Sequence, residues 1–236
     1  MPTVLVTGAN RGLGLEFVRQ YAADGWRVHA ACRSPDVAGA LAELCARHGS
    51  IEMHALDVTS PASIDRLAAA LRGVPIDVLL NNAGVFGPRP TADADPRQSF
   101  GSVDPEVWLG VVRVNALAPL LIAQAFVEHV AASEHKKIVA ISSELGSIAG
   151  TSGGLHAYRA SKAALNMAMA SLARELAPRG VVIGVYCPGW VRTSMGGTSA
   201  PLAPVDSVSA LRERIAGLGS QDSGAFRLYD GTPIPW

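Results

Sequence analysis

Six short runs of apolar and β-branched residues, separated by helical stretches, constrain the fold of this chain more than any other feature. The runs occupy residues 3–7, 26–32, 51–58, 75–82, 137–143 and 181–187. The stretches between them repeat apolar side chains about every 3.6 residues, as helices with one apolar face do. Apolar strands that alternate with helices indicate a parallel sheet covered on both faces, and right-handed crossovers make it doubly wound. We therefore expect one α/β domain over residues 1–236, with about seven strands.

Composition argues against several kinds of protein and partner. Hydrophobic residues make up 49% of the chain and charged residues 17%, which is typical of a globular protein. The formal net charge is zero, so we expect neither nucleic acid nor an anionic membrane as a partner. We also expect no signal peptide and no membrane span, because no uninterrupted run of 18 apolar residues occurs. The three cysteines lack disulfide spacing, which predicts reduced thiols and a cytoplasmic location.

A glycine-rich turn, TGANRGLG, follows the first run and precedes a helix. It contains Gly8, Gly12 and Gly14. Glycine permits positive φ and close backbone approach, and a helix N-terminus offers free N–H groups to a diphosphate. Alone, this turn could simply join a strand tightly to a helix. Its place after the first strand of a doubly wound sheet, with NNAG (81–84) ending the fourth run beside it, favours a dinucleotide site.

A tyrosine and a lysine lie four residues apart in the helical stretch HAYRASKAALN, at Tyr158 and Lys162. Positions i and i+4 share one face of a helix, so the phenol and the ammonium can reach a common point. The pair is either an ordinary surface contact or a proton donor whose acidity the lysine adjusts. Arginine fills 17 of the 20 basic positions, yet lysine stands here, where a compact ammonium differs from a planar guanidinium.

Several motifs together are similar to those of one enzyme superfamily. The chain resembles the short-chain dehydrogenase/reductases, in order and approximate spacing, through TGANRGLG, Asp57-Val58, NNAG, Asn115, Ser143, the Tyr158/Lys162 pair and Pro188-Gly189. SSELGSI, YRASKAALN, PGWVRTSMGG and DGTPIPW resemble its sniffer-type carbonyl reductase and C-factor-like branch. The resemblance implies a Rossmann fold and hydride transfer between NAD(P)(H) and a small carbonyl or secondary alcohol substrate. The alternative is a dinucleotide-binding signalling or regulatory protein of the C-factor type with little turnover.

The resemblance assigns the catalytic roles. Tyr158 would give a proton to a carbonyl oxygen, or take one from a hydroxyl. A free phenol has a pKa near 10, so a nearby cation must favour the phenolate, and Lys162 would supply that charge and hold the nicotinamide ribose. Ser143, at the end of the fifth run, would hydrogen-bond the substrate oxygen. Ser142 is its rival, but neighbouring strand residues face opposite sides, so only one can point at the site.

Asn115 is the fourth residue that the superfamily uses. Pro119 follows it by four positions and cannot donate a hydrogen bond to its carbonyl, so the helix should kink there. In the superfamily this asparagine accompanies a kinked helix and a bound water that relays protons to the lysine. The alternative is a kink without chemistry.

The resemblance also implies a set of cofactor contacts. They are Gly8, Asn10, Arg11, Gly12, Leu13 and Gly14 in the glycine turn, then Arg33, Asp57, Val58, Asn82, Ala83 and Gly84, and finally Tyr158, Lys162, Pro188, Gly189, Val191 and Thr193. Asp57 and Val58 would contact adenine, unless they form only a strand-end turn. Residues 188–193 would wrap the nicotinamide carboxamide. His156 and Cys187 either line the substrate pocket or are structural, and the scattered histidines predict no metal site.

The segment after the second run bears on the choice between the two nicotinamide cofactors. NAD-preferring enzymes carry a carboxylate there to accept from the ribose 2′-hydroxyl, but residues 28–35 contain none. Arg33 follows the run instead, and Arg11 lies in the glycine turn. Two guanidinium groups suit a 2′-phosphate, which favours NADP(H) and leaves NAD(H) possible. The alternative is that both arginines are merely solvated.

Two helical stretches, residues 116–132 and 160–177, are apolar or small nearly all round. A helix that covers a sheet needs one apolar face, so a second apolar face implies a further partner. In the superfamily the corresponding helices pair across a two-fold axis, which predicts a homodimer or homotetramer. The long loop at residues 86–106 could cover that face instead.

Overall fold

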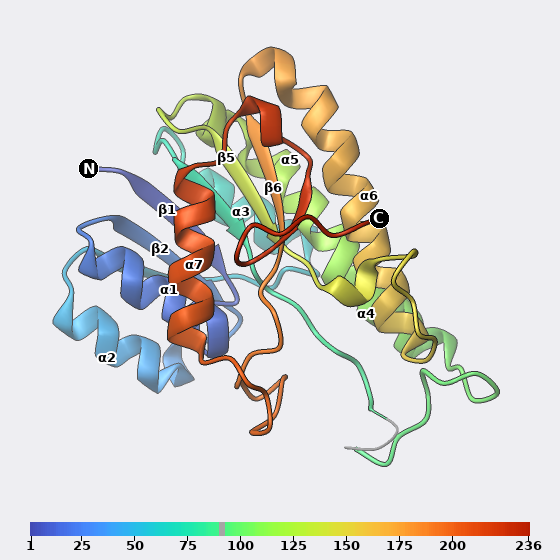
Figure 1. Cartoon of the computed structure of the whole chain (residues 1–236). Coiled ribbons are helices and arrows are strands. Elements are labelled where there is room, and N and C mark those ends of the chain that lie inside the picture. Colours follow the sequence, from blue (N-terminus) through green and yellow to red (C-terminus); the bar gives the residue numbers. More distant parts are fainter. Residues whose placement is uncertain (90–92) are drawn as a thin grey trace.

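The computed structural model describes residues 1–89 and 93–236, and its strands form one parallel sheet (Figure 1). The strand order is β3-β2-β1-β4-β5-β6-β7, so the connections leave the sheet in opposite directions on the two sides of β1 and β4. This confirms the doubly wound architecture. The strands are β1 (Thr3–Thr7), β2 (Arg27–Cys32), β3 (Ile51–Ala55), β4 (Val78–Asn81), β5 (Lys137–Ile141), β6 (Val182–Cys187) and β7 (Phe226–Leu228).

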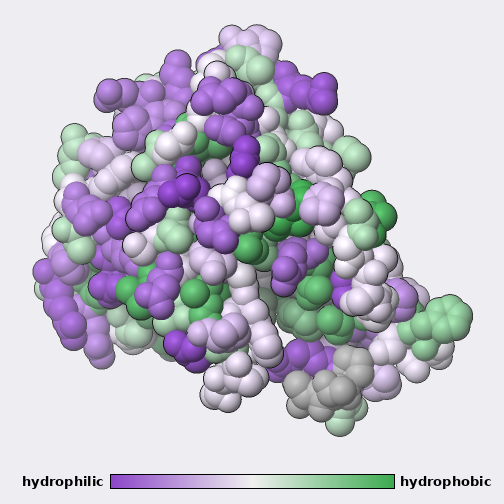
Figure 2. Space-filling model, viewed as in Figure 1, coloured by the Kyte–Doolittle hydropathy of each residue, from purple (hydrophilic) through white to green (hydrophobic). Residues whose placement is uncertain are grey.

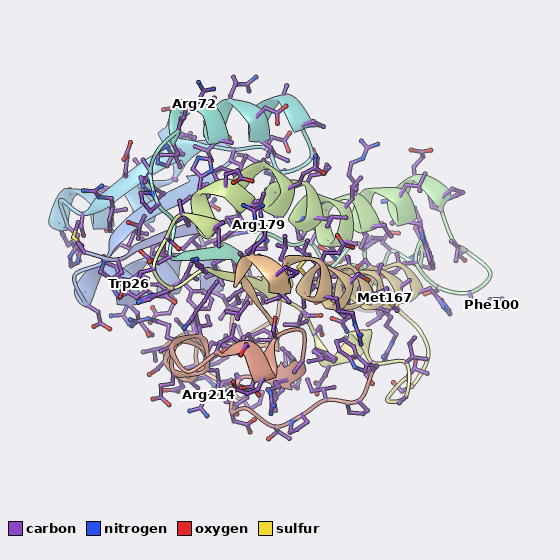
Figure 3. The ribbon with its side chains drawn as sticks, turned by 90° about the horizontal axis from the view of Figure 1, so that it is seen from above. Trp26, Arg72, Phe100, Met167, Arg179 and Arg214 are labelled. Carbon is purple, nitrogen blue, oxygen red and sulfur yellow. The ribbon has the colours of Figure 1, made fainter. Side chains whose placement is uncertain are left out.

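Alternate strand residues serve two separate cores, one on each face of the sheet. Leu5 and Ala31 pack with α3 (Pro61–Ala70), α5 (Ala118–Ala131) and α6 (His156–Leu176). Val4 and Val6 pack with α1 (Gly12–Ala23), α2 (Gly39–Arg47) and α7 (Pro204–Ala216). Because both faces are covered, the strands are apolar at successive positions rather than alternately apolar and polar. Figure 3 shows α7 and α5 on opposite sides of the sheet.

Apart from β1, which spans its predicted run, the strands are shorter than the apolar runs that predicted them. The third run continues to residue 58, but β3 ends at Ala55, and the fifth continues to residue 143, but β5 ends at Ile141. In both places the chain leaves the ladder at the carboxyl end of the strand while its side chains stay partly buried. The sequence pattern did not locate β7, because three residues are too few to show a period.

One helical stretch passes the length and apolarity test for a membrane span. It covers Pro105–Ala131, combining α4 (Pro105–Val112), a π-helical turn (Arg113–Leu117) and α5, although no uninterrupted run of 18 apolar residues occurs. In its most apolar window 44% of the residues are buried within the fold, with α5 packed against α3 and β4 and α4 against α6. Helices of protein cores satisfy the same test, so the observation is weak evidence for a membrane.

Parallel strands deliver their carboxyl ends to one edge of the sheet. At the middle of this edge lie β1 and β4, from which successive connections diverge, and this is where open α/β sheets bind ligands. Figure 2 shows a hollow with apolar atoms on its wall below these ends. The surface over α1 and α2 in the same view is mostly hydrophilic. The segments that follow β1, β4, β5 and β6 therefore lie at the edge of the sheet where a ligand would bind.

Candidate active site

The turn after β1 has a backbone path that only glycine follows without strain. Gly8 and Gly12 have φ of +66° and +54°, in the left-handed region. A Cβ at Gly14 would collide with the carbonyl of Gly8, so the first turn of α1 packs directly onto the end of β1. Asn10 and Arg11 are exposed between these glycines. The N-terminus of α1 therefore opens onto the carboxyl edge of the sheet, as a diphosphate site requires.

The NNAG segment after β4 is hydrogen-bonded to the end of β1 and to the glycine turn. The Asn82 side chain donates to the carbonyls of Thr7 (2.8 Å) and Gly8 (3.3 Å). The Thr7 hydroxyl accepts from the backbone N–H groups of Asn82 (3.0 Å) and Ala83 (3.1 Å). A Cβ added at Gly84 would lie 3.3 Å from the Asn115 amide oxygen. Because glycine has no side chain, the backbone at residue 84 can lie close to Asn115.

Asn115 lies in the π-helical turn Arg113–Leu117, at the place where the proline predicted a kink. The N–H of Ala118 bonds to the carbonyl of Arg113, five residues back, so the helix takes an extra residue before Pro119. The Asn115 amide accepts from the Val85 N–H (2.9 Å) and donates to the Val85 carbonyl (2.8 Å). These two hydrogen bonds fix the position of the segment that follows NNAG.

Tyr158 and Lys162 lie in the first two turns of α6, and both are buried, with exposed fractions of 6% and 5%. The Lys162 ammonium is 5.8 Å from the centroid of the Tyr158 ring and donates to the Ile141 carbonyl at the end of β5 (2.9 Å). A Cβ at Gly84 would lie 3.8 Å from the Lys162 Nζ. An exposed surface pair is therefore excluded, and the Lys162 ammonium lies beside the NNAG segment.

Burial dominates the ionisation of this pair. Burial raises the pKa of Tyr158 to about 12, against a hydrogen bond from Ser143 that lowers it. Burial also lowers the pKa of Lys162 to about 8. The sequence-based expectation that a cation lowers the pKa of Tyr158 is therefore not met in this structure, where burial raises that pKa and the opposing effect comes from Ser143. At neutral pH the phenol keeps its proton and the ammonium its charge.

The two neighbouring serines point in different directions, as alternation predicts. The Ser142 hydroxyl is buried and donates to the amide oxygen of Asn166 on α6 (2.6 Å). Ser143 is only partly buried and caps the short 3-10 turn Glu144–Gly146, accepting from the Leu145 N–H (3.2 Å). Of the two, Ser143 is the one that reaches Tyr158.

The segment after β6 lies over the glycine turn. A Cβ on Gly12 would be 3.5 Å from the Thr193 methyl group. Gly189 has a φ of +78°, and the Pro188 carbonyl accepts from Ser207 (2.7 Å), which fixes the exit from β6. Val191 is buried and pairs with Leu202. The segment after β6 thus borders the glycine turn at the carboxyl edge of the sheet.

Arg11 and Arg33 lie on either side of a direct contact between the glycine turn and β2. The Ala9 N–H donates to the Ala31 carbonyl (3.1 Å), and each arginine follows one of these residues by two positions. Both arginines are exposed, and neither forms an ion pair with any residue that the structure describes. Arg33 also helps to lower the pKa of Asp57, after the hydrogen bonds from Thr59. Val58, next to it, is buried.

Sequence reasoning missed two residues that touch Tyr158. Phe86 stacks on the Tyr158 ring, with centroids 4.3 Å apart and planes at 27°. Gln98 is fully buried, accepts from the Tyr158 N–H (3.2 Å), and donates to the carbonyls of Phe86 (3.2 Å) and Pro88. Both belong to the loop at residues 86–106, of which 90–92 lie outside the described residues. No local pattern marks either residue, because their partners are far along the chain.

His156 and Cys187 both border the site. The His156 N–H donates to the Gln98 carbonyl (3.1 Å), so it connects α6 to the same loop. Cys187 is buried at the end of β6, its sulfur accepts from the Gly189 N–H (3.4 Å), and burial raises the pKa of its thiol. The structure therefore gives Cys187 a packing role and His156 a backbone contact to the loop.

The site combines a buried phenol, a serine hydroxyl that lowers the pKa of that phenol, a buried ammonium and a glycine-rich turn at the carboxyl edge of the sheet. Comparison with known proteins agrees with this chemistry. The family model described as short chain dehydrogenase matches residues 2–201. C-signal of Myxococcus xanthus is 40% identical over 163 residues, which are 69% of this chain and 93% of that protein.

Two solved structures cover the whole of this chain. Carbonyl reductase Sniffer of D. melanogaster superposes with a TM-score of 0.89 at 33% identity, over 100% of both chains. NADPH-bound carbonyl reductase from chicken fatty liver superposes with a TM-score of 0.90 at 34% identity, over 100% of this chain and 99% of that one. The chain therefore belongs to the short-chain dehydrogenase family of oxidoreductases, in the branch that contains the Sniffer carbonyl reductase and C-signal.

Proposed function

We propose that this protein is an NADP(H)-dependent carbonyl reductase that uses Tyr158 as its proton donor. The observation that carries the proposal is the convergence, at the switch point of the sheet, of Tyr158 with Lys162 and with Ser143 just after β5, where Gly84 lies beside the Lys162 Nζ. The nicotinamide cofactor would supply the hydride, and the glycine turn and the segment after β6 would hold it. The glycine turn fits such a group, because Asn10 and Arg11 are exposed there and no side chain that the structure describes caps the first N–H groups of α1, which a diphosphate can bind.

The chain's own residues account for the proton. The Ser143 and Tyr158 hydroxyls lie within reach of each other and would both donate to the substrate's carbonyl oxygen. When that oxygen gains electron density, the Tyr158 proton moves to it and leaves a phenolate. The Lys162 ammonium, 5.8 Å from the ring centroid, favours this negative charge. Phe86 and Gln98 keep the ring and its backbone in place.

The two exposed arginines support NADP(H) over NAD(H). NADP(H) is the cofactor of carbonyl reductases in this family, as the NADPH-bound structure from chicken fatty liver illustrates. Here the place of an acidic 2′-hydroxyl acceptor is taken by Arg33, and Arg11 lies on the adjoining turn. A guanidinium can bind a 2′-phosphate through two parallel, charge-assisted hydrogen bonds, whereas a neutral 2′-hydroxyl cannot form such a pair.

The test is turnover of a panel of ketones, aldehydes and quinones with NADPH, by wild type and by Tyr158→Phe. We expect turnover of at least one panel member, and a loss of at least about a hundredfold in kcat for the variant, the lower end of a general acid's contribution. NADPH affinity should stay nearly unchanged, because only the hydroxyl is removed. A variant that keeps more than about a hundredth of wild-type kcat would contradict the assignment.

A second candidate is a signalling protein that binds the cofactor with little turnover. The observation that favours it is the 40% identity to C-signal. Tight NADPH binding together with no turnover of any panel member would support this candidate and reject the reductase.

A further inference from the structure

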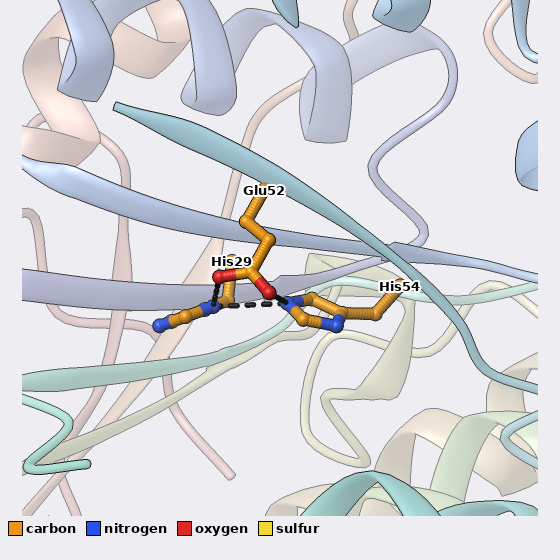
Figure 4. A group of neighbouring side chains, drawn as sticks. All are labelled: His29, Glu52 and His54. Carbon is orange, nitrogen blue, oxygen red and sulfur yellow. Dashed lines mark hydrogen bonds and ion pairs between the residues drawn. The ribbon is translucent and has the colours of Figure 1, made fainter. Parts of the chain in front are cut away.

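Three metal-binding side chains meet on the edge of the sheet, away from the glycine turn (Figure 4). His29 belongs to β2, and Glu52 and His54 belong to β3. The register pairs His29 with Glu52 and Ala31 with His54. Because paired residues in neighbouring strands point to the same face, and so do residues two apart, all three side chains project together.

The three ligand atoms have the spacing of a metal site. The His29 Nδ1 is 2.9 Å from the His54 Nε2 and 3.5 Å from one Glu52 oxygen, and the other Glu52 oxygen is 3.9 Å from the His54 Nε2. Bonds of about 2.0–2.1 Å to a tetrahedral zinc ion put neighbouring ligand atoms about 3.3 Å apart. The observed distances lie on both sides of that value, so small side-chain rotations would suffice.

Burial and charge also suit a cation. The side chains of His29 and His54 are 2% and 11% exposed, whereas Glu52 is 63% exposed and opens the cluster to solvent at the edge strand. Burial lowers the pKa of both rings, that of His29 to about 4, which favours their neutral forms. Neutral imidazole and ionised carboxylate are the forms that bind metals.

We propose that His29, Glu52 and His54 bind one divalent transition-metal ion of the zinc class, with solvent as the remaining ligand. Two imidazoles and one carboxylate are a known zinc ligand set. The ion would fix the edge strand β3 to β2. His54 lies three residues before Asp57, and the Leu56 N–H donates to the Cys32 carbonyl (2.8 Å), so the ion would also steady the strand end beside Arg33. In this structure the His29 and His54 rings hydrogen-bond each other directly.

The test is titration of the metal-stripped full chain with ZnCl₂, followed by calorimetry and by thermal unfolding. We expect one site per chain, a higher Tm with zinc, and the visible absorption of a tetrahedral site when Co²⁺ replaces zinc. His54→Gln and Glu52→Gln should each weaken zinc binding at least about tenfold, the factor that even an outer-shell change costs. His135→Gln, at an exposed histidine outside the cluster, is the matched control and should leave binding unchanged.

Two results would overturn the proposal. One is no saturable zinc binding by the wild type. The other is equal zinc affinity in wild type and Glu52→Gln. Glu52 is exposed, so this variant should fold normally and its zinc affinity can be compared directly with that of the wild type. Binding is measured without substrate or cofactor, so the result does not depend on the proposed reductase activity.

Discussion

At the scale of single residues, the ionisation of Tyr158 and Lys162 leads to a pH dependence. Carbonyl reduction needs a protonated Tyr158 and a charged Lys162. The pKa of Tyr158 is about 12, so the phenol stays protonated at all ordinary pH values, whereas the pKa of Lys162 is about 8, so the ammonium loses its charge above that pH. We therefore predict that kcat/KM for reduction is flat below pH 8 and falls as pH rises through about 8. The measurement is a pH–rate profile at saturating NADPH, with Tm recorded at each pH to exclude unfolding. A flat profile up to pH 10 would refute this prediction.

Arg33 carries the second prediction at this scale. Replacing it by Asp should remove a contact to the 2′-phosphate and add repulsion, so Arg33→Asp should lose at least about tenfold of its NADPH preference over NADH in kcat/KM. Arg72→Asp makes the same charge change in the connection from α3 to β4, which enters the amino end of that strand. It should leave the preference unchanged (Figure 3 labels Arg72). Equal kcat/KM values for the two cofactors in wild type would show that the arginines do not select NADP(H).

At the scale of elements, the loop at residues 86–106 is joined to the start of α6 through Gln98. Gln98→Leu deletes the hydrogen bond to the Tyr158 N–H and those to the Phe86 and Pro88 carbonyls. We predict a loss of roughly 1–3 kcal/mol of stability, together with at least a tenfold lower kcat and unchanged NADPH affinity.

The control for Gln98 is another buried glutamine with hydrogen bonds of its own. Gln20 on α1 donates to Glu16 (2.7 Å) and to the Val205 carbonyl (3.1 Å), far from Tyr158 in the fold. Gln20→Leu should lower the Tm comparably and keep kcat. If both variants lose kcat in proportion to their loss of stability, Gln98 is merely structural.

At the scale of the whole molecule, α4, the π-helical turn Arg113–Leu117 and α6 leave apolar side chains in solvent. Leu109, Leu117 and Met167 are 57%, 47% and 69% exposed, and α4 packs beside α6. Figure 3 labels Met167 on α6, and Phe100 of the loop lies beyond the end of that helix. The described part of the loop thus leaves this face uncovered, and we propose that a second copy of the chain covers it.

The corresponding prediction concerns mass in solution. Light scattering at micromolar concentration should give a dimer or tetramer for the wild type, and Met167→Glu and Leu117→Glu should each lower the mass towards that of one chain. A charge at either position would have to be desolvated in the interface. Val205→Glu, at an exposed valine on α7 across the sheet, should not change the mass. A monomeric wild type would refute the prediction.

Local rules explain what the sequence by itself determined. The doubly wound sheet follows from apolar runs between helices, the glycine turn from backbone sterics, and the shared face of Tyr158 and Lys162 from the helical repeat. Each depends on residues close together in the chain, where geometry is nearly independent of the rest of the fold.

Contacts between distant residues were decided only by the tertiary structure. Gln98 meets Tyr158 across 60 positions, and His29 meets His54 through strand register, so neither contact leaves a local pattern. The direction of the Tyr158 pKa shift was predicted wrongly for the same reason. The charge of Lys162 can be read from a spacing of four residues, but desolvation depends on every segment that packs around the phenol.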